Sequence, residues 1–580
     1  MTILLNNINS FLQNDVLTLL LTIIWFFSFS LILSDLLNKK QGEMYLLSFI
    51  ISSLLLFIGG IFNNIKLFYY IGWVLILVYL VYVICKKKIK DLLSKIDLFS
   101  SIMFLIILII LLILYQNKGF VATDEFMHWG PMVRDMFNIN KFYCVPEATL
   151  EIHKDYPPLF SLIELLFCIF KGEYRECYLY VALIYFYFSI AIAIMSKKEK
   201  ILDKSLILLS FILLGFTAQT YPSSMFEIVT IYASIYIDYV LVVFAAYVIY
   251  SELIAKTNTY QDKIIRILFS SALLLSKQIG IVFFLLYALV LFTRKRLDII
   301  SIVLPIIPLG IWKIITYLYQ ITGQFSFSNV LLRDSGFIIK DYLKALLIRP
   351  IFIRPIPCSF IAACVVLIAL LMFVSYKEHQ NYYLAFLVGT LLYSVTLMVL
   401  YCFVFSIDEA ITLASFERYM YTYVLFGFAY ILLIIFDNFD NKLIHVLACI
   451  LLFVFSDFDN SNIYKIVDHK DILVIKQWGD KISFEESRDN GYVLNFKIHE
   501  YINDNINYDE LTKEISNYHY LYVYLYDDNF YNYWVDYTGD YGLENDSVFY
   551  IANNGVVSYS NDNFSKIHHA IKYYLHIDKQ

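Results

Sequence analysis

The stretch that decides the fold runs from Leu98 to Gln116 and reads LFSSIMFLIILIILLILYQ. It carries no charged side chain, and it is long enough to cross the hydrocarbon core of a bilayer, which takes roughly 17 to 25 apolar residues. Runs of the same kind lie on both sides of it. We therefore expect a mainly α, polytopic transmembrane helical bundle and not a soluble enzyme.

Composition leads to the same conclusion. Of the 580 residues, 60% are hydrophobic and 16% are charged, against about 45 to 50% and about 25% in soluble domains. This excess of apolar side chain cannot be buried inside an aqueous globule, so the bilayer is the expected main solvent. The eight cysteines do not suggest a disulfide scaffold, and no basic, aromatic module suggests a nucleic-acid partner.

We mark twelve full spans along the chain: about 16–36, 43–62, 66–85, 98–116, 176–195, 205–221, 229–250, 298–319, 358–375, 382–404, 419–436 and 442–456. Basic clusters in short loops favour the cytoplasm. Four such clusters set the orientation: Lys39-Lys40, Lys86-Lys87-Lys88, Lys197-Lys198 and Arg294-Lys295-Arg296. Two stretches must then be irregular. Residues 157–170 are predicted to form a short re-entrant or interfacial helix, and 264–293 two shortened helices that meet at Ser276-Lys277-Gln278.

This path divides the chain into three parts. Residues 1–96 are extra N-terminal transmembrane helices, 97–457 are the membrane core with a first outer loop at 117–156, and 458–580 are an aqueous tail. The tail has 20 acidic and 10 basic side chains, so its net charge is −10 in a chain of net charge −6. Its short β-rich runs at 472–475, 520–526 and 548–559, with helical spacing at 564–576, predict a small extracytoplasmic α/β domain.

The densest outward signal reads TDEFMHWGPMVRDMF, from Thr123 to Phe137. It places Asp124 and Glu125 beside a helical apolar repeat, which predicts an amphipathic helix on the outer leaflet. A solvated loop with a surface helix is the alternative. The same loop ends in Asp155-Tyr156 before Pro157-Pro158, where proline can start the short helix and orient both side chains; a simple helix-entry turn explains these residues equally well.

These residues suit one kind of reaction outside a membrane. Nucleotide sugars are cytoplasmic, so an outer sugar transfer needs a donor already attached to a lipid phosphate. Phosphate departs without a general acid, so the site needs one carboxylate to take the acceptor proton and cations or a metal to hold the phosphate charge. Asp124 or Glu125 could be the base. Lys277, which is costly within an apolar stretch, and Arg418 could be the cations.

Each of these polar residues could also have a purely structural role. Lys277 could extend to the outer surface from two helix ends, and Arg418 could pair with Glu417 or with lipid headgroups. Asp238 lies inside a predicted span and is a functional candidate for that reason, although a hydrogen bond to a tyrosine hydroxyl would also account for it. His128 and His153 could ligate a metal, but two histidines far apart in one loop are a weak signal.

Taken in order, these motifs look like the GT-C superfamily of integral membrane glycosyltransferases. The motifs are the acidic pair Asp124-Glu125 with its helix, Tyr156 to Leu159 opening a short helix, and Ser276-Lys277 between shortened helices. The chain is similar to the branch of protein mannosyltransferases and the aminoarabinose transferase of lipid A. The resemblance covers roughly residues 97–320, with a weaker echo at Arg418-Tyr419.

The resemblance implies that Asp124 is the catalytic base, that Glu125 assists it or binds a divalent metal such as Mg or Mn, and that Lys277 contacts the lipid phosphate. Arg418 and Tyr419 would occupy the donor-binding position of a late loop. The remaining outward polar and aromatic side chains are assigned to substrate binding: Asp155, Tyr156, His128, Trp129 and Asp238.

The implied donor is a polyprenyl-phosphate sugar, the implied acceptor is a cell-surface glycan, a lipid or a protein, and the expected location is the bacterial plasma membrane. The chain also departs from the family pattern, because Asp155-Tyr156 stands where some relatives have Lys before the two prolines. The chain therefore lacks the basic side chain that these relatives have at that position. Two other functions fit the sequence: a transporter or flippase of lipid-linked saccharides, and a polysaccharide polymerase or ligase.

Overall fold

The computed structural model describes most of the helical part of the chain and, beyond residue 471, only strands. The described ranges are 2–116, 118–120, 124–150, 153–217, 219–220, 228–321, 335–353, 356–374, 380–405, 407–438, 442–456 and seven strands between 472 and 559. Within these ranges the protein is mainly α, with twenty α-helices, and eight helices are long and apolar enough to cross a membrane. The protein is therefore an integral membrane protein by the length and composition of its helices.

All twelve apolar runs predicted as spans contain a helix. The eight long ones are α2 (Val16–Leu37), α3 (Gln41–Ile61), α4 (Ile65–Cys85), α9 (Glu176–Met195), α11 (Ile237–Ile254), α14 (Ile299–Leu318), α17 (Gln380–Phe403) and α19 (Phe416–Asn438). The other four are shorter: α6 (Leu98–Leu114), α10 (Ile201–Gly215), α16 (Phe360–Val374) and α20 (Lys442–Phe455). Apolar length thus located each of these twelve helices, while the helix ends moved by several residues, most of all in α10 and α11.

Both irregular stretches are also helical where the sequence placed them. The first is α8 (Leu159–Lys171), and the second divides into α12 (Tyr260–Ser276) and α13 (Gly280–Thr293). The division follows from the backbone, because Lys277 is extended, with φ −165° and ψ 163°. The chain then turns back so closely that a Cβ at Gly280 would overlap the carbonyl oxygen of Leu273. Only glycine allows this approach.

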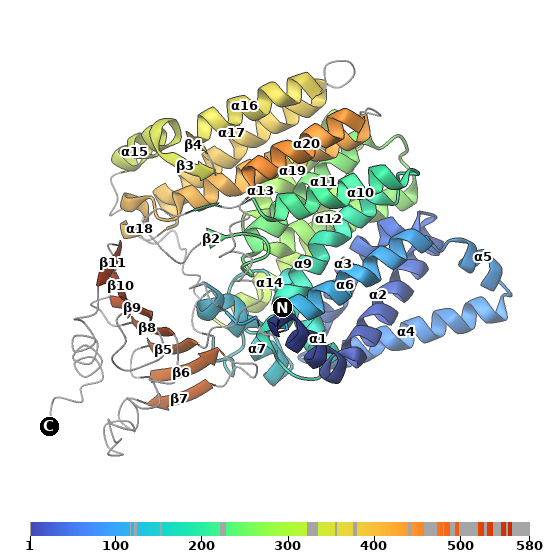
Figure 1. Cartoon of the computed structure of the whole chain (residues 1–580), viewed down its shortest axis with the longest axis horizontal. Helices are drawn as coiled ribbons and strands as arrows, with labels where there is room; N and C mark the ends of the chain where they lie inside the picture. The colour runs from blue at the N-terminus through green and yellow to red at the C-terminus, as the bar shows by residue number, and fades with distance from the viewer. Residues whose placement is uncertain are drawn as a thin grey trace.

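The helices surround α9, which is buried along its whole length. It packs against α3, α6, α8, α10 and α11, and Figure 1 shows it in the middle of the bundle. By contrast, α4 and α14 are largely exposed and carry rows of large apolar side chains. In a membrane protein such faces contact lipid, so the bundle is a protein-filled interior within an apolar surface.

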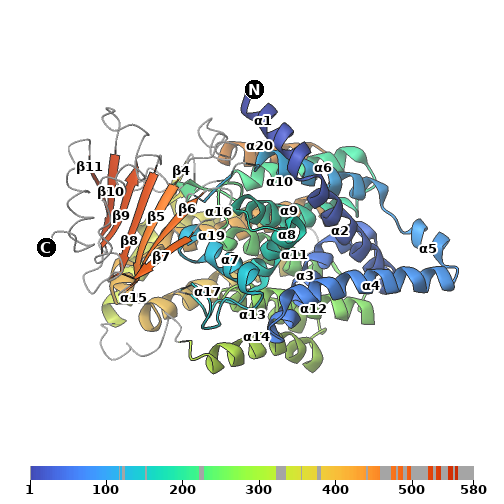
Figure 2. The ribbon, with the colours of Figure 1, turned by 90° about the horizontal axis from the view of Figure 1, so that it is seen from below.

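The two ends of the helical body differ, and both views separate them (Figures 1 and 2). One end, which we call the loop end, carries α7 (Gly130–Ile139), α18 (Ile407–Thr412) and the hairpin of β3 (Pro350–Ile353) and β4 (Ile356–Ser359). These strands continue a sheet begun by β1 (Gln219–Thr220) and β2 (Ile228–Val229), in the order β2-β1-β3-β4. The smaller helices α1 (Thr2–Asn14), α5 (Ile89–Ser94) and α15 (Ser335–Ile348) had no counterpart in the sequence prediction.

The opposite end, which we call the basic end, carries α5 in both views. The predicted basic clusters follow the ends of α2, α4, α9 and α13. Lys40 Nζ donates to the carbonyl oxygen of Ser196, 3.1 Å away, which joins the first cluster to the start of the Lys197 cluster. Arg296 pairs with Glu252 at 2.8 Å and Lys39 pairs with Asp262 at 2.6 Å. The clusters therefore share one end, as the positive-inside rule predicts for a single side of a membrane.

The predicted amphipathic helix is present, but the prediction that it lies on the membrane surface is wrong. It forms as a π-helical turn, η1 (Glu125–Trp129), followed by α7, but Met132, Val133 and Met136 are buried in the protein. Here α7 packs against α8, and Met132 contacts Ser161. An apolar helix face fits protein as well as lipid because both are equally apolar. The helix is therefore part of the body and does not lie on the outer leaflet.

The described tail is one seven-stranded sheet in the order β11-β10-β9-β8-β5-β6-β7, in which β5 and β8 are parallel and the other pairs antiparallel. Its strands are β5 (Ile472–Trp478), β6 (Lys481–Ser487), β7 (Val493–Lys497), β8 (Tyr520–Tyr526), β9 (Tyr531–Asp536), β10 (Ser547–Ala552) and β11 (Gly555–Tyr559). The β-rich runs at 472–475 and 520–526 are thus confirmed as strands, and the run at 548–559 divides into β10 and β11. The helix predicted at 564–576 lies outside the described residues.

Candidate functional site at the loop end

The first pair of the site joins the first outer loop to the last long span. Arg418, in the first turn of α19, donates through Nη1 to Oδ2 of Asp124, 2.7 Å away. Asp124 flanks η1 at its N-terminal side. π-Helical turns are rare in proteins, and those that occur are often found at functional sites. Glu417 instead pairs with Arg349 at 2.6 Å. The alternative in which Arg418 pairs with its neighbour Glu417 is therefore wrong.

The second pair joins the break between α12 and α13 to the start of α11. Lys277 Nζ lies 2.9 Å from both carboxylate oxygens of Asp238. Asp238 lies in the first turn of α11, where the helix dipole favours a negative charge. The carboxylate of Asp238 is thus bound by a lysine and not by a tyrosine hydroxyl, and Lys277 has a protein partner.

Aromatic rings lie around each of the two cations. Lys277 Nζ is 5.3 Å from the ring centre of Trp129 and 5.7 Å from that of Tyr156. The guanidinium of Arg418 is 5.2 Å from the ring of Tyr236, and Tyr419 flanks it at 5.5 Å. Cation–π attraction holds a charge in place through the ring face, without a hydrogen bond. Both cations are thus oriented by aromatic rings as well as by a carboxylate.

The four charged side chains differ in access to solvent. The side chain of Asp124 is 29% exposed, those of Arg418 and Lys277 are 15% and 13% exposed, and that of Asp238 is 5% exposed. The buried Asp238 serves Lys277 as a fixed counter-ion. Of the two carboxylates, Asp124 is therefore the one that solvent can reach.

Two histidines line the same group. His153 has a left-handed backbone, φ 55°, a conformation that non-glycine residues adopt rarely and often at functional positions. Its ring stacks on Tyr156 at 4.4 Å and meets the ring of His128 at 4.5 Å. Burial lowers the pKa of the His153 imidazole to about 4; Asp124 opposes this shift, while Lys277 and Arg418 add to it. His153 is therefore a neutral ring at neutral pH.

Asp155 connects the loop to two helices. Its Oδ2 accepts from Gln278 at 3.3 Å and lies 3.7 Å from Lys313 Nζ, while its backbone oxygen accepts from the indole N–H of Trp312 at 3.0 Å. Sequence reasoning did not find these three partners or Tyr236. Gln278 and Tyr236 lie close in sequence to Lys277 and Asp238, which is a usable signal, but Trp312 and Lys313 lie inside an ordinary apolar run.

Glu125 lies apart from the rest of the predicted site. Its side chain is fully buried and accepts a hydrogen bond from the backbone N–H of Ile235 at 2.8 Å. It thereby fixes the turn that leads into α11, which begins at Ile237. Adjacent residues on a helical turn point about 100° apart, which lets Asp124 face Arg418 while Glu125 faces Ile235. The side chain of Glu125 thus supports a turn of the backbone, and it does not lie beside Asp124 and Arg418 as the expected catalytic or metal-binding role requires.

The described residues supply no cluster of protein ligands for a metal. Among them, no three His, Cys, Asp or Glu side chains gather closely enough to hold an ion. The expectation of Mg or Mn therefore has no set of ligands within this part of the chain. The positive charge of the site is carried by Lys277 and Arg418.

The other predicted site residues meet in one place although they come from five separate segments. Asp124, Asp155, Asp238, Lys277 and Arg418 are joined through the contacts above, and the aromatic side chains of His128, Trp129, Tyr156 and Tyr419 lie among them. Such an arrangement can bind an oxyanion with two cations and offer one accessible carboxylate as a base. No protein-family model, curated protein or solved structure matches the chain.

Proposed function

We propose that the protein is a membrane glycosyltransferase that moves a sugar from a polyprenyl-phosphate donor to an extracytoplasmic acceptor. The observation that carries this proposal is the pairing of Asp124 with Arg418 beside the pair of Lys277 with Asp238. Two oriented cations match the phosphate of such a donor, and one accessible carboxylate matches the single base that the reaction needs.

In the proposed reaction the acceptor hydroxyl oxygen forms a bond to the anomeric carbon of the sugar. The bond from that carbon to the phosphate oxygen breaks, and its electron pair leaves with the polyprenyl phosphate. Asp124 takes the hydroxyl proton. Lys277 and Arg418 hold the negative charge that gathers on the leaving phosphate, which is the step where fixed cations lower the barrier most.

The pair of Arg418 and Asp124 fits this reaction because a guanidinium has five N–H donors. A donor phosphate would compete for these N–H groups and draw Arg418 partly away from the carboxylate. The released oxygen of Asp124 could then accept the proton. Lys277 would keep Asp238 as its counter-ion, since that carboxylate is nearly inaccessible. Binding of the donor would thus prepare the base.

The finer description of the fold belongs to the same proposal. We infer a GT-C type bundle with about twelve spans and two shortened helices, in which the loop end faces outward and the basic end faces the cytoplasm. The gathering of basic clusters at the opposite end supports this orientation. The acidic tail would then lie outside as well, where glycan, lipid or protein acceptors are found.

The direct test uses the full-length chain in proteoliposomes with undecaprenyl phosphate carrying radiolabelled hexoses or pentoses. Label is followed into glycan, lipid and protein fractions of a cell envelope, together with release of undecaprenyl phosphate. Asp124→Asn should lower the transfer rate by about 10²- to 10⁴-fold, because it removes the general base. Glu147→Gln is the matched control, since Glu147 is an exposed acid of the same loop that pairs with Lys141.

Full transfer by Asp124→Asn would refute the assigned base. Movement of the labelled lipid across the bilayer without any new glycosidic bond would replace the transferase by a flippase. Incorporation of label only into a growing polymer whose units are all lipid-linked would favour the polymerase or ligase.

A further inference from the structure

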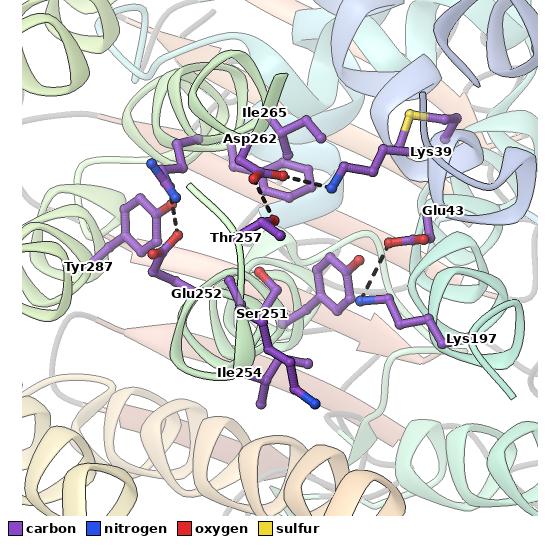
Figure 3. A pocket seen from close by; sticks show the side chains of 16 residues that line it. Lys39, Glu43, Lys197, Ser251, Glu252, Ile254, Thr257, Asp262, Ile265 and Tyr287 are labelled. Carbon is purple, nitrogen blue, oxygen red and sulfur yellow. Dashed lines mark hydrogen bonds and ion pairs between the residues drawn. The ribbon is translucent and has the colours of Figure 1, made fainter. Parts of the chain in front are cut away.

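A cavity of about 230 Å³ opens at the basic end, and no residue of the candidate site lines it. Figure 3 shows it between the turn that joins α2 to α3, the end of α9, the end of α11 and the start of α12. The lining carries many charges for a space at a membrane boundary. The cations are Lys39, Lys197, Lys256 and Arg266, and the acids are Glu43, Glu252 and Asp262.

The acids of the cavity neutralise its cations only in part: Asp262 pairs with Lys39 at 2.6 Å, but the other acids leave positive charge uncovered. Glu252 is shared, because it accepts from Arg266 Nε at 2.8 Å and from Arg296 Nη1 at 2.8 Å. Lys197 Nζ lies 3.5 Å from Glu43, which is long for an ion pair, where N···O is usually about 2.7 to 2.9 Å. Lys256 lies at the rim and is exposed. The lining therefore has a surplus of positive charge.

Arg266 provides a second and independent observation. The residue is 4% exposed; its Nε donates to Glu252 and its Nη1 to Asn258 Oδ1 at 2.6 Å. Its third nitrogen, Nη2, is buried and has no hydrogen-bond partner among the residues that the structure describes. Buried N–H groups of a cation are destabilising without an acceptor and nearly always have one, so an acceptor is expected there.

The C-terminal end of α11 lies at the cavity. The carbonyl oxygens at a helix C-terminus usually repel an anion, but here they are covered. Arg294 donates to the backbone oxygens of Leu253 and Ala255, and Arg296 also donates to Ala255 at 2.7 Å. The last carbonyls of α11 are thereby covered by two guanidinium groups. The negative end of the helix dipole is neutralised where it meets the cavity.

We propose that this cavity binds a phosphate group, contributed either by the headgroup of an anionic lipid or by free phosphate from the aqueous side. Its oxygens would accept from Arg266 Nη2 and from the remaining donors of Lys39 and Lys197, each of which has three. The volume exceeds the ~30 Å³ share of a water molecule but lies below the roughly 300 Å³ at which sites for drug-sized ligands begin. A phosphate group fits this size.

The test uses the full-length protein in nanodiscs, with two probes. In phosphatidylcholine discs, inorganic phosphate is titrated and binding is followed by thermal stabilisation, with sodium chloride at matched ionic strength as reference. In discs that also contain phosphatidylglycerol, native mass spectrometry counts retained anionic lipid. Arg266→Lys keeps the charge but removes Nη2, and Lys256→Gln removes one rim charge. Lys295→Gln is the control, since Lys295 is an exposed cation at the same end that does not line the cavity.

We expect about tenfold weaker binding in Arg266→Lys, about threefold weaker binding in Lys256→Gln and no change in Lys295→Gln. Binding of inorganic phosphate identifies the free anion as a source, and selective retention of phosphatidylglycerol identifies the lipid. The proposal is overturned if neither probe binds, if chloride stabilises equally, or if Lys295→Gln weakens binding as much as Arg266→Lys. None of these outcomes depends on glycosyl transfer, so the two proposals stand or fall separately.

Discussion

The loop end and the basic end of the bundle both contain buried cations, but the two ends pair them differently. At the loop end each cation has one carboxylate and two flanking rings, as Lys277 has with Asp238. At the basic end one carboxylate, Glu252, serves both Arg266 and Arg296, and backbone carbonyls take further donors. Single pairs can exchange a partner for a substrate anion without loss of structure. A carboxylate shared by two arginines at a helix end holds several helices together. We therefore expect substitutions at the basic end to lower stability more than they lower activity.

The strongest test of this difference is Glu252→Gln. The substitution keeps the shape of the side chain but leaves the guanidinium groups of Arg266 and Arg296 without their common counter-ion. Breaking a buried ion pair from one side costs about 3 to 5 kcal/mol, so the free energy of unfolding in mixed micelles should fall by that order. Activity per folded molecule should stay unchanged.

Glu147→Gln is the matched control for that measurement, because Glu147 belongs to an exposed pair at 2.7 Å from Lys141. Such surface pairs contribute about 0 to 1 kcal/mol. Asp124→Asn should also unfold more like this control than like Glu252→Gln, since its side chain is partly exposed. If Glu252→Gln unfolds no more easily than Glu147→Gln, the distinction between the two ends is lost.

A second test concerns the cation at the loop end. Lys277→Ala should weaken binding of undecaprenyl phosphate in nanodiscs by about 10- to 100-fold, the size of a lost charged hydrogen bond. Lys277→Arg should weaken it by only about two- to threefold because the charge remains. Binding can be followed by the part of the tryptophan fluorescence that is lost in Trp129→Phe, since Trp129 lies 5.3 Å from Lys277 Nζ and is one of six tryptophans.

Because Lys277→Ala leaves Asp238 as an unpaired buried acid, it could lose binding through misfolding alone. The double variant Lys277→Ala with Asp238→Asn removes both charges and restores neutrality. If the double variant binds undecaprenyl phosphate as tightly as the native chain, Lys277 has a structural role only. Weak binding in a well-folded double variant supports direct contact with the phosphate.

Local features were predictable from the sequence because their causes are local. The apolar runs fixed the helices, and Lys277 between two short runs marked the break between α12 and α13. The convergence of Asp124 with Arg418, 294 positions later, rested on orientation and family resemblance. Side-chain direction could not be read in this way, so Glu125 was assigned a catalytic or metal-binding role although it supports the turn at Ile235.

Packing partners were the other limit. The apolar face of α7 was assigned to lipid because no pattern within one helix distinguishes a lipid neighbour from a protein neighbour. The network around Glu252 was missed for a related reason, since charge counting located the basic clusters but not the acids that bind them. Tertiary contacts decide both cases.

The smallest expected effect is a pH dependence of stability that arises at the loop end, from His153, and not at the basic end. Its pKa is lowered to about 4 in the folded protein, against about 6.5 in an unfolded chain. The unfolded state therefore binds more protons between these values, so stability is complete above pH 6.5 and falls as the pH decreases toward 4. At pH 5.5 the loss should be about 1 kcal/mol.

His153→Gln, measured by thermal unfolding in micelles from pH 7.5 to 4.5, should lack this part of the pH dependence. The control Lys295→Gln at the basic end should retain it. Equal pH dependence in both variants would mean that the imidazole at the loop end is not held neutral by its burial.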